Sequence, residues 1–217
     1  MENTLLKIKN LSFKFDEDNI IFDNAKLEIE NGTKNIIQGP NGSGKTTLLY
    51  ILCGIYKCDF DLHWQGEDKK IEDIVTHIGY VPEKPYLYEY LTGEENIILL
   101  SEIFKLNKDE IDTVYRYIDD LGLRNDMKKM VKDYSAGMRD KLYFSCVLAR
   151  NIQLLLMDEP FTTFDADSQK KAMDIVNQFV EGGGAVITIS HIKEFFNSFN
   201  ENVFCIKNRR ILSGEEQ

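Results

Sequence analysis

Apolar and polar residues alternate near the start of the chain, in the pattern of strands that bury only one face. The pattern covers residues 5–15 and 20–29, and in the second segment Ala25, Leu27 and Ile29 alternate with charged residues. Successive side chains of a strand point to opposite faces, so each segment gains one apolar face. We therefore expect two strands here.

Shorter apolar runs farther along the chain predict buried strands, and the segments between them have helical periodicity. We expect strands at residues 34–38, 60–65, 77–81, 154–158 and 185–189, and a terminal hairpin of residues 203–206 with 210–212. We expect helices at residues 48–53, 135–151 and 168–181, with another that begins near residue 192. Strands that alternate with helices favour a mainly parallel sheet, with ligands at the carboxyl ends of its strands.

The middle of the chain, residues 90–133, is helical instead. Thr92 with Glu95, and Asn107 with Glu110, have the spacing of capping boxes, in which each side chain bonds the other residue's backbone amide. The second of these helices carries its apolar residues on one face, namely Ile111, Val114, Tyr115, Ile118 and Leu121. This segment is therefore predicted to be a helical insertion in an α/β domain.

The length and the charge limit the class of protein. A chain of 217 residues with 43% hydrophobic content buries a full core, so we predict one domain over residues 1–217. Residues 1–89 and 134–217 would form its core and β subdomain, around the helical subdomain at 90–133. Acidic residues outnumber basic ones 36 to 26, so we expect no nucleic acid partner. No apolar run approaches the ~20 residues that span a bilayer, so we expect no transmembrane segment, and we expect no secretory leader either.

The four cysteines and three histidines give no sign of a metal site. Cys53, Cys58, Cys146 and Cys205 lack C-x-x-C spacing and nearby histidines. We therefore expect buried thiols of a protein in the reducing cytosol.

The loop that follows residues 34–38 carries the strongest chemical signal. Residues 39–47 read GPNGSGKTT and fit G-x-x-x-x-G-K-[ST] at every required position. Glycines let the backbone curl until its amides point at a phosphate chain, and the next helix adds its positive N-terminal end. The alternative is a glycine-rich turn with an exposed lysine, which the strand-loop-helix setting disfavours. The sequence predicts a nucleoside triphosphate site formed by Gly39, Asn41, Gly42, Ser43, Gly44, Lys45, Thr46 and Thr47.

Three side chains of this loop have separate roles in such a site. Lys45 would reach the β- and γ-phosphates, and the Thr46 hydroxyl would bind Mg²⁺. Thr47 would add a donor to the α-phosphate.

A second constellation is the apolar strand at residues 154–158 that ends in Asp158 and Glu159. Asp158 would hold Mg²⁺ beside the phosphate loop, and Glu159 would orient or deprotonate the attacking water. The alternative is a buried strand with a solvated acidic end, which the matching phosphate loop upstream disfavours.

Taken in order, these segments resemble a known family. The segments are GPNGSGKTT at 39–47, YSAGM at 134–138, LLLMDEP at 154–160, TTFD at 162–165 and ISH at 189–191. Their order and spacing are similar to those of the ATPase subunits of ABC transporters, over essentially the whole chain. The resemblance implies an α/β P-loop NTPase fold with a mainly parallel core sheet, an antiparallel β subdomain and a helical insertion. It also implies ATP and Mg²⁺ as ligands.

The resemblance assigns further residues, each with a plainer alternative. Phe15 would stack on adenine, or belong to the core. Asp165 would face a second subunit, or cap the turn before the next helix. His191 would contact the γ-phosphate as a catalytic residue, or begin a helix after Ser190.

The segment YSAGM stands where the family has the signature LSGGQ. In the family this segment lies across the γ-phosphate of ATP held by the partner subunit. Ser135 and Gly137 are retained, so both phosphate donors survive, and a helix N-terminus with a serine suits an oxyanion. Ala136 departs from the usual glycine and would crowd the dimer interface. The alternative for Ser135 is an ordinary helix N-cap.

Glu83 is the largest departure, because the family has glutamine at this position. A carboxylate still binds Mg²⁺, but it adds negative charge near the γ-phosphate and removes a donor. Glu83 therefore puts the hydrolysis rate in question rather than ATP binding. Phe164 likewise replaces a leucine.

The pattern of residues 91–96 and the pair Gly137-Met138 are most similar to ATPases of bacterial exporters with separate membrane subunits. The resemblance implies an ATP-hydrolysing motor, peripheral on the cytoplasmic face of the cell membrane, with a second ATPase subunit and transmembrane permease subunits as partners. Its docking surface would comprise Pro85, Tyr86, Leu87, Tyr88, Tyr90 and Leu91, although loop packing explains some of these equally well. The alternatives are a soluble ABC ATPase of translation or DNA maintenance and a nucleotide-gated module with weak turnover.

Overall fold

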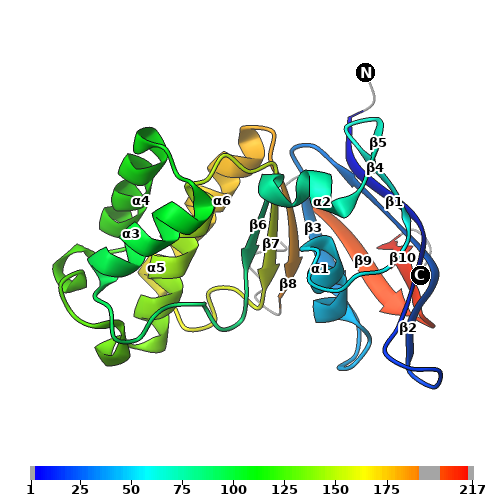
Figure 1. Ribbon diagram of the computed structural model, residues 1–217, viewed down its shortest axis with the longest axis horizontal. Helices are drawn as coiled ribbons and strands as arrows, with labels where there is room; N and C mark the ends of the chain where they lie inside the picture. Colours follow the sequence, from blue (N-terminus) through cyan, green and yellow to red (C-terminus); the bar gives the residue numbers. More distant parts are fainter. Residues whose placement is uncertain (1–2, 191–200, 215–217) are drawn as a thin grey trace.

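The computed structural model describes residues 3–190 and 201–214, which two sheets organise (Figure 1). The larger sheet has six strands in the order β10-β9-β3-β8-β7-β6. Its strands are β3 (Lys34–Gln38), β6 (Ile78–Val81), β7 (Leu154–Asp158), β8 (Ala185–Ile189), β9 (Glu201–Lys207) and β10 (Arg210–Ser213).

Neighbouring strands of the six-stranded sheet run parallel, except for the antiparallel hairpin of β9 and β10. Strands β7 and β8 are buried along their whole length, as expected for the centre of a sheet that is covered on both faces. Because β3, β6 and β7 are parallel, their carboxyl ends share one edge. This edge receives residues 39–47, Glu83 and Asp158.

The smaller sheet is antiparallel throughout, with the order β2-β1-β4-β5. It consists of β1 (Thr4–Lys14), β2 (Ile20–Glu30), β4 (Asp61–Trp64) and β5 (Glu67–Lys69). In β2 the alternation has its expected result, because Ala25, Leu27 and Ile29 are buried while their neighbours Lys26 and Glu28 are exposed.

Helix α1 (Lys45–Leu52) lies between the two sheets (Figure 1). Its side chains Leu48, Leu49, Ile51 and Leu52 are fully buried and share one core with residues of both sheets. This packing fixes the start of α1 at the edge where the strands of the larger sheet end.

The longer remaining helices form a second core on the opposite face of the six-stranded sheet (Figure 1). They are α3 (Gly93–Phe104), α4 (Lys108–Asp120), α5 (Ala136–Leu148) and α6 (Ala166–Glu181). Both predicted capping boxes are present, since Thr92 accepts from the Glu95 amide at 3.2 Å and Asn107 from the Glu110 amide at 3.0 Å. Shorter pieces are α2 (Ile71–Ile74) and the 3₁₀ helices η1 (Val75–His77), η2 (Arg124–Asp126) and η3 (Val131–Asp133).

The mainly parallel core sheet, the antiparallel sheet and the helices confirm the predicted fold class. Several boundaries differ from the prediction: α1 begins at Lys45, α5 ends at Leu148 and α6 begins at Ala166. Strand β5 and helix α2 were not predicted, because three and four residues are too few to give a periodic signal. The predicted helix near residue 192 lies outside the described residues.

The expectation of four buried thiols is wrong for three of them. Cys146 is buried, whereas Cys53, Cys58 and Cys205 are only partly buried. Within the described residues, every helix is too short or too polar to cross a bilayer.

Candidate nucleotide-binding site

Three glycines give the loop after β3 its shape. Gly39, Gly42 and Gly44 have φ angles of 150°, 78° and 101°, which side-chain-bearing residues rarely adopt. Space is also limited, because a Cβ atom on Gly44 would lie 2.4 Å from Cγ2 of Ile21 in β2. The loop therefore needs glycine for its backbone and for its close approach to the smaller sheet.

The N-terminus of α1 opens onto this loop with its amides free of any side-chain cap. Its N-cap is Gly44, and no side chain among the described residues makes a capping hydrogen bond there. The Ser43 Oγ atom is buried and has no hydrogen-bond partner among the described residues. Free amides, a positive helix end and an unpartnered buried hydroxyl together fit an anion such as a phosphate chain.

The side chain of Lys45 folds back over the loop. Its Nζ atom donates to the carbonyl oxygens of Gly39 at 2.9 Å and Pro40 at 3.1 Å. The ammonium is therefore held beside the free amides by neutral acceptors, which a phosphate oxygen can replace. Asn41 is exposed at the loop tip, and Thr47 lies in the first turn of α1.

Thr46 and Asp158 come from distant parts of the chain and meet at the sheet edge. The Thr46 hydroxyl donates to Oδ2 of Asp158 at 2.8 Å. Burial raises the pKa of Asp158 and the Glu83 charge acts in the same direction, while the Thr46 hydrogen bond and Lys45 oppose them. A hydroxyl and a buried carboxylate at the sheet edge are a donor set that suits Mg²⁺.

Glu159 follows β7 with a left-handed backbone. Its φ angle is 46°, and its amide donates to the Ile189 carbonyl oxygen at 2.8 Å. Phe161 is left-handed too, with φ of 65°. Non-glycine residues are held in this region at an energetic cost, and such strain gathers at functional sites.

Glu83 follows β6 at the same edge. Its side chain is exposed, and its negative charge contributes to the raised pKa of Asp158. The structure thus brings all three residues of the predicted metal site, Thr46, Glu83 and Asp158, to one edge of the sheet.

Phe15 lies just beyond the end of β1 and is 50% exposed, so it is not a core residue. Its ring contacts those of Phe13 and Tyr56.

Within the single chain, Ser135 and Asp165 each cap the N-terminus of a helix, as the plainer alternatives for these residues predict. Ser135 is the N-cap of α5 and accepts from the Met138 amide at 3.2 Å. Asp165 is the N-cap of α6 and accepts from the Ser168 amide at 2.9 Å and hydroxyl at 2.7 Å. These bonds and the nearby Lys141 ammonium hold the pKa of Asp165 well below its usual range. The assigned roles toward a second subunit remain predictions, and His191 lies outside the described residues.

The sequence analysis missed the contacts that join the start of α5 to the segment before α6. A Cβ atom on Gly137 would lie 2.7 Å from the Thr163 carbonyl oxygen. Lys141 donates to Asp165 at 3.2 Å and lies 5.6 Å from the centre of the Phe164 ring. The unusual Phe164 was the available signal, because an aromatic ring suits a neighbouring cation.

A family model described as "ABC transporter" matches residues 22–162, which include the phosphate loop, the segment YSAGM and β7 with Glu159. The chain belongs to the ABC transporter family. This match confirms the resemblance to ABC transporter ATPases that the sequence motifs indicated.

Named relatives of this ABC protein agree with that membership. It is 31% identical to the uncharacterized ABC transporter ATP-binding protein YhcH of Bacillus subtilis, over 87% of this chain and 62% of YhcH. The chain therefore spans less than two thirds of that relative. It is 29% identical to the lantibiotic transport ATP-binding protein SrtF of Streptococcus pyogenes, over 87% of this chain and 80% of SrtF. It is 28% identical to the zinc import ATP-binding protein ZnuC of Wolbachia pipientis, over 99% of this chain and 85% of ZnuC.

Solved structures agree on the fold of the ABC chain. The structure of an ATP binding subunit of an ABC transporter has a TM-score of 0.86 and 22% identity, over 97% of this chain and 90% of that one. This likeness confirms the P-loop ATPase fold, with a mainly parallel core sheet beside an antiparallel one.

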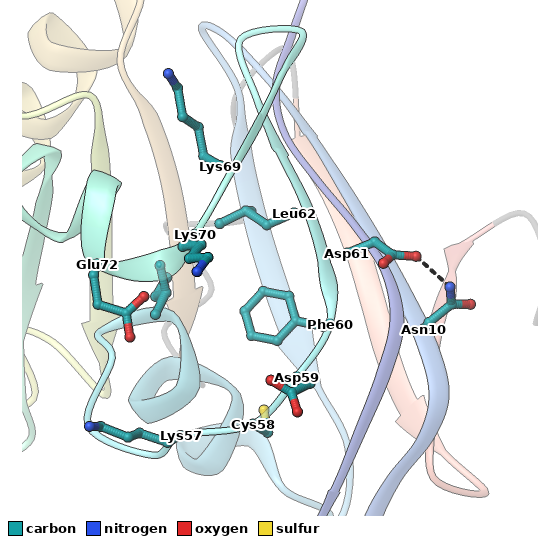
Figure 2. A pocket seen from close by; sticks show the side chains of 11 residues that line it. Asn10, Lys57, Cys58, Asp59, Phe60, Asp61, Leu62, Lys69, Lys70 and Glu72 are labelled. Atoms are coloured by element: carbon teal, nitrogen blue, oxygen red, sulfur yellow. Dashed lines mark hydrogen bonds between the residues drawn. The ribbon is translucent and has the colours of Figure 1, made fainter.

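A hollow of about 610 Å³ lies away from the phosphate loop of this ABC chain. Figure 2 shows Phe60 near its centre, Lys57 and Glu72 to one side, and the hydrogen-bonded pair Asp61 and Asn10 on the other. Its lining includes no residue of the phosphate loop or of β7. We therefore assign it no part in nucleotide binding.

Proposed function

We propose that this chain is the ATP-binding and ATP-hydrolysing subunit of a membrane transporter, attached at the cytoplasmic face to separate transmembrane subunits. One observation carries the proposal: the Thr46 hydroxyl and the Asp158 carboxylate meet at 2.8 Å beside the phosphate loop. In P-loop ATPases such a pair holds the metal of the nucleotide. Membership of the ABC transporter family, whose named relatives are ATP-binding proteins of transporters, supports the transport role.

The loop and helix α1 bind the phosphate chain in this proposal. The glycine amides of the loop and the open N-terminal end of α1 donate to phosphate oxygens. The Ser43 hydroxyl gains the partner that it lacks among the described residues. Lys45 exchanges the Gly39 and Pro40 carbonyl oxygens for phosphate oxygens. Phe15 stacks on the adenine base with its exposed side.

Thr46, Asp158 and Glu83 supply oxygen ligands for Mg²⁺. When bound, Mg²⁺ neutralises charge on the β- and γ-phosphate oxygens. Glu159 orients the attacking water and accepts its proton as general base. The strained backbone at Glu159 supports this role, because it fixes where the carboxylate can point.

Two copies of the chain complete each site across a dimer interface. Ser135 and Gly137 at the N-terminus of α5 face the γ-phosphate held by the partner copy, and Asp165 faces the partner too. The helix end supports this role, because its amides and positive dipole suit an oxyanion. His191 completes the catalytic set as the contact to the γ-phosphate.

The transmembrane subunits dock beside the loop that follows Glu83. Tyr86, Tyr88 and Tyr90 are 59%, 60% and 78% exposed, and a group of large exposed aromatic side chains marks a surface that binds another protein. Leu87 instead packs on the helical core, as the alternative of a packed loop requires. A partly apolar cavity of about 190 Å³, lined by Ile55, Tyr80 and Phe104 among others, adds a recess for an apolar side chain of the partner.

We propose export as the direction of transport. The pattern of residues 91–96 and the pair Gly137-Met138 support it, as does the similarity to the lantibiotic transport protein SrtF. The nearly equal similarity to the zinc import protein ZnuC means that identity alone does not separate export from import.

The test is mass spectrometry of the proteins that co-purify with the tagged chain from detergent-solubilised native membranes. A stoichiometric polytopic membrane protein is the expected result, and its class identifies the cargo. Ribosomes or DNA-maintenance proteins in its place would contradict the transport proposal and favour a soluble ABC ATPase.

A further inference from the structure

Phe15 lies in a cluster of three aromatic rings that no sequence motif indicates. The centre of its ring lies 5.1 Å from that of Phe13 and 5.5 Å from that of Tyr56, with interplanar angles of 83° and 90°. Phe13 and Tyr56 stack on each other at 5.5 Å and 16°. Phe15 thus makes an edge-to-face contact with each of two parallel rings.

The two supporting rings come from different elements. Phe13 belongs to β1, and Tyr56 follows α1, where its amide donates to the Tyr50 carbonyl oxygen at 3.3 Å. The Tyr56 ring also contacts that of Tyr50 in α1, at 5.4 Å. The Phe15 ring is therefore tied both to the smaller sheet and to the helix that begins at the phosphate loop.

From this geometry we infer that Phe13 and Tyr56 are positioning residues for the nucleotide base, because they hold the Phe15 ring in the orientation that stacks on adenine. The inference rests on the proposed function, in which Phe15 is the stacking residue. It adds residues to the site that the motifs do not include.

The physical reason is preorganisation. A phenylalanine at a strand end has several rotamers, and a base that stacks on it must first select one. Two edge-to-face neighbours select that rotamer before the base arrives, so less entropy is lost on binding. An aliphatic residue in place of Tyr56 keeps apolar contact but loses the directional edge-to-face interaction.

The effect is specific to the base, which separates it from a general structural effect. Residues 39–47 bind the phosphates in the proposed function. Within the described part of the chain, the ring contacts of Tyr56 are with Phe13, Phe15 and Tyr50, outside that loop. Loss of the Tyr56 ring therefore weakens binding of ATP but leaves binding of inorganic tripolyphosphate unchanged.

The experiment is isothermal titration of the purified full-length chain with ATP and with inorganic tripolyphosphate, each with Mg²⁺. We expect Tyr56→Leu to raise the Kd for ATP about fivefold, the size of one lost aromatic pair, with no change for tripolyphosphate. Tyr56→Phe keeps the ring and keeps wild-type affinity. Tyr117→Leu is the matched control, because Tyr117 is another partly buried tyrosine, in α4, and it changes neither Kd. Phe13→Leu repeats the test at the second supporting ring.

Two outcomes overturn the inference. In the first, Tyr56→Leu and Phe13→Leu leave the ratio of the two Kd values as in the wild type, whether or not both constants shift. In the second, Phe15→Leu itself leaves that ratio unchanged, which removes the base-stacking role of Phe15 as well. If Phe15→Leu changes the ratio and the two supporting variants do not, Phe15 stays the stacking residue and only the positioning role fails.

Discussion

Gly137 lies against the backbone of Thr163, so closely that a Cβ atom on Gly137 would stand 2.7 Å from the Thr163 carbonyl oxygen. The Thr163 hydroxyl donates to Asp140 at 2.5 Å, and Lys141 pairs with Asp165 at 3.2 Å. Three contacts therefore join the start of α5 to the segment before α6. In the proposed dimer both segments face the partner, so we expect them to move as one unit.

Gly137→Ala tests this junction. The added methyl group forces the two backbones apart, so we expect a loss of about 1–3 kcal/mol in the free energy of unfolding, typical of overpacking. We also expect weaker ATP-dependent dimerisation. Urea unfolding measures the first effect and sedimentation velocity with MgATP the second. Gly182→Ala at the end of α6 is the control, because the φ angle of −73° at Gly182 accommodates alanine. If both variants have the same free energy of unfolding, the close contact at Gly137 does not affect stability.

Glu159→Gln tests the assignment of the general base. Glutamine keeps the size of the side chain and its place after β7, but it cannot accept the proton of the attacking water. We expect phosphate release to fall by at least about 100-fold, the contribution of a general base, while MgATP binding persists and an ATP-bound dimer accumulates. Steady-state phosphate release and gel filtration with MgATP measure the two effects. Hydrolysis at more than a tenth of the wild-type rate would contradict the assignment.

Glu83→Gln tests whether the unusual carboxylate limits turnover. The Glu83 charge contributes to the raised pKa of Asp158, so it acts on the residues proposed to hold the metal. Glutamine removes this charge and adds an amide donor, so we expect MgATP hydrolysis to rise several-fold. The matched control is Glu89→Gln, which removes a carboxylate from the same loop. The Glu89 carboxylate forms an ion pair with Arg139 at 2.7 Å and has no role in the proposed metal site. An unchanged or lower rate for Glu83→Gln would mean that the carboxylate does not restrain hydrolysis.

Much of the phosphate site could be predicted from the sequence because its determinants are local. Glycines at 39, 42 and 44 have the positive φ angles that the motif requires, and the capping boxes at Thr92 and Asn107 form as their spacing indicates. Local backbone chemistry sets such features, so a few adjacent residues suffice to predict them.

Contacts between distant segments could not be predicted in the same way. The approach of Gly137 to Thr163 depends on how α5 packs beside the segment before α6, and the contact of Phe15 with Tyr56 depends on how α1 packs on β1. Neither pair has a spacing that a sequence pattern can reveal. The same reason explains why one chain shows Ser135 and Asp165 only as helix caps, because their predicted roles depend on a second subunit.

Asp158→Asn separates stability from function at the metal site. Burial raises the pKa of Asp158, so its charged form is disfavoured in the folded protein, and a neutral amide can still accept the Thr46 hydrogen bond. We expect the unfolding free energy without nucleotide to stay within about 1 kcal/mol of the wild type. The thermal stabilisation by MgATP should be lost, since an amide is a poorer Mg²⁺ ligand. Thermal unfolding with and without MgATP measures both, with the exposed Asp112→Asn in α4 as control; full MgATP stabilisation of Asp158→Asn would contradict the metal role.

The cysteines give a pH dependence of stability whose sign follows from their burial. Burial raises the pKa of Cys53 and of Cys146, each to about 12 from an ordinary value of 9.0. Between pH 9 and 12 the unfolded chain therefore binds fewer protons at these thiols than the folded chain does. Stability falls as pH rises through this window, by up to about 1.4 kcal/mol per pH unit for each thiol.

Urea unfolding at pH 8.0, 9.5 and 10.5 measures this dependence, at about 25 °C in a reducing buffer. The wild type should lose stability over this range, and Cys146→Ala should lose less, because the proton of Cys146 no longer differs between the states. Burial also raises the pKa of Tyr134 and Tyr143 to about 12, so the tyrosines add a decline that both proteins share. The difference between the two slopes isolates Cys146. Parallel slopes for the wild type and Cys146→Ala would contradict a protonated, buried thiol at this position.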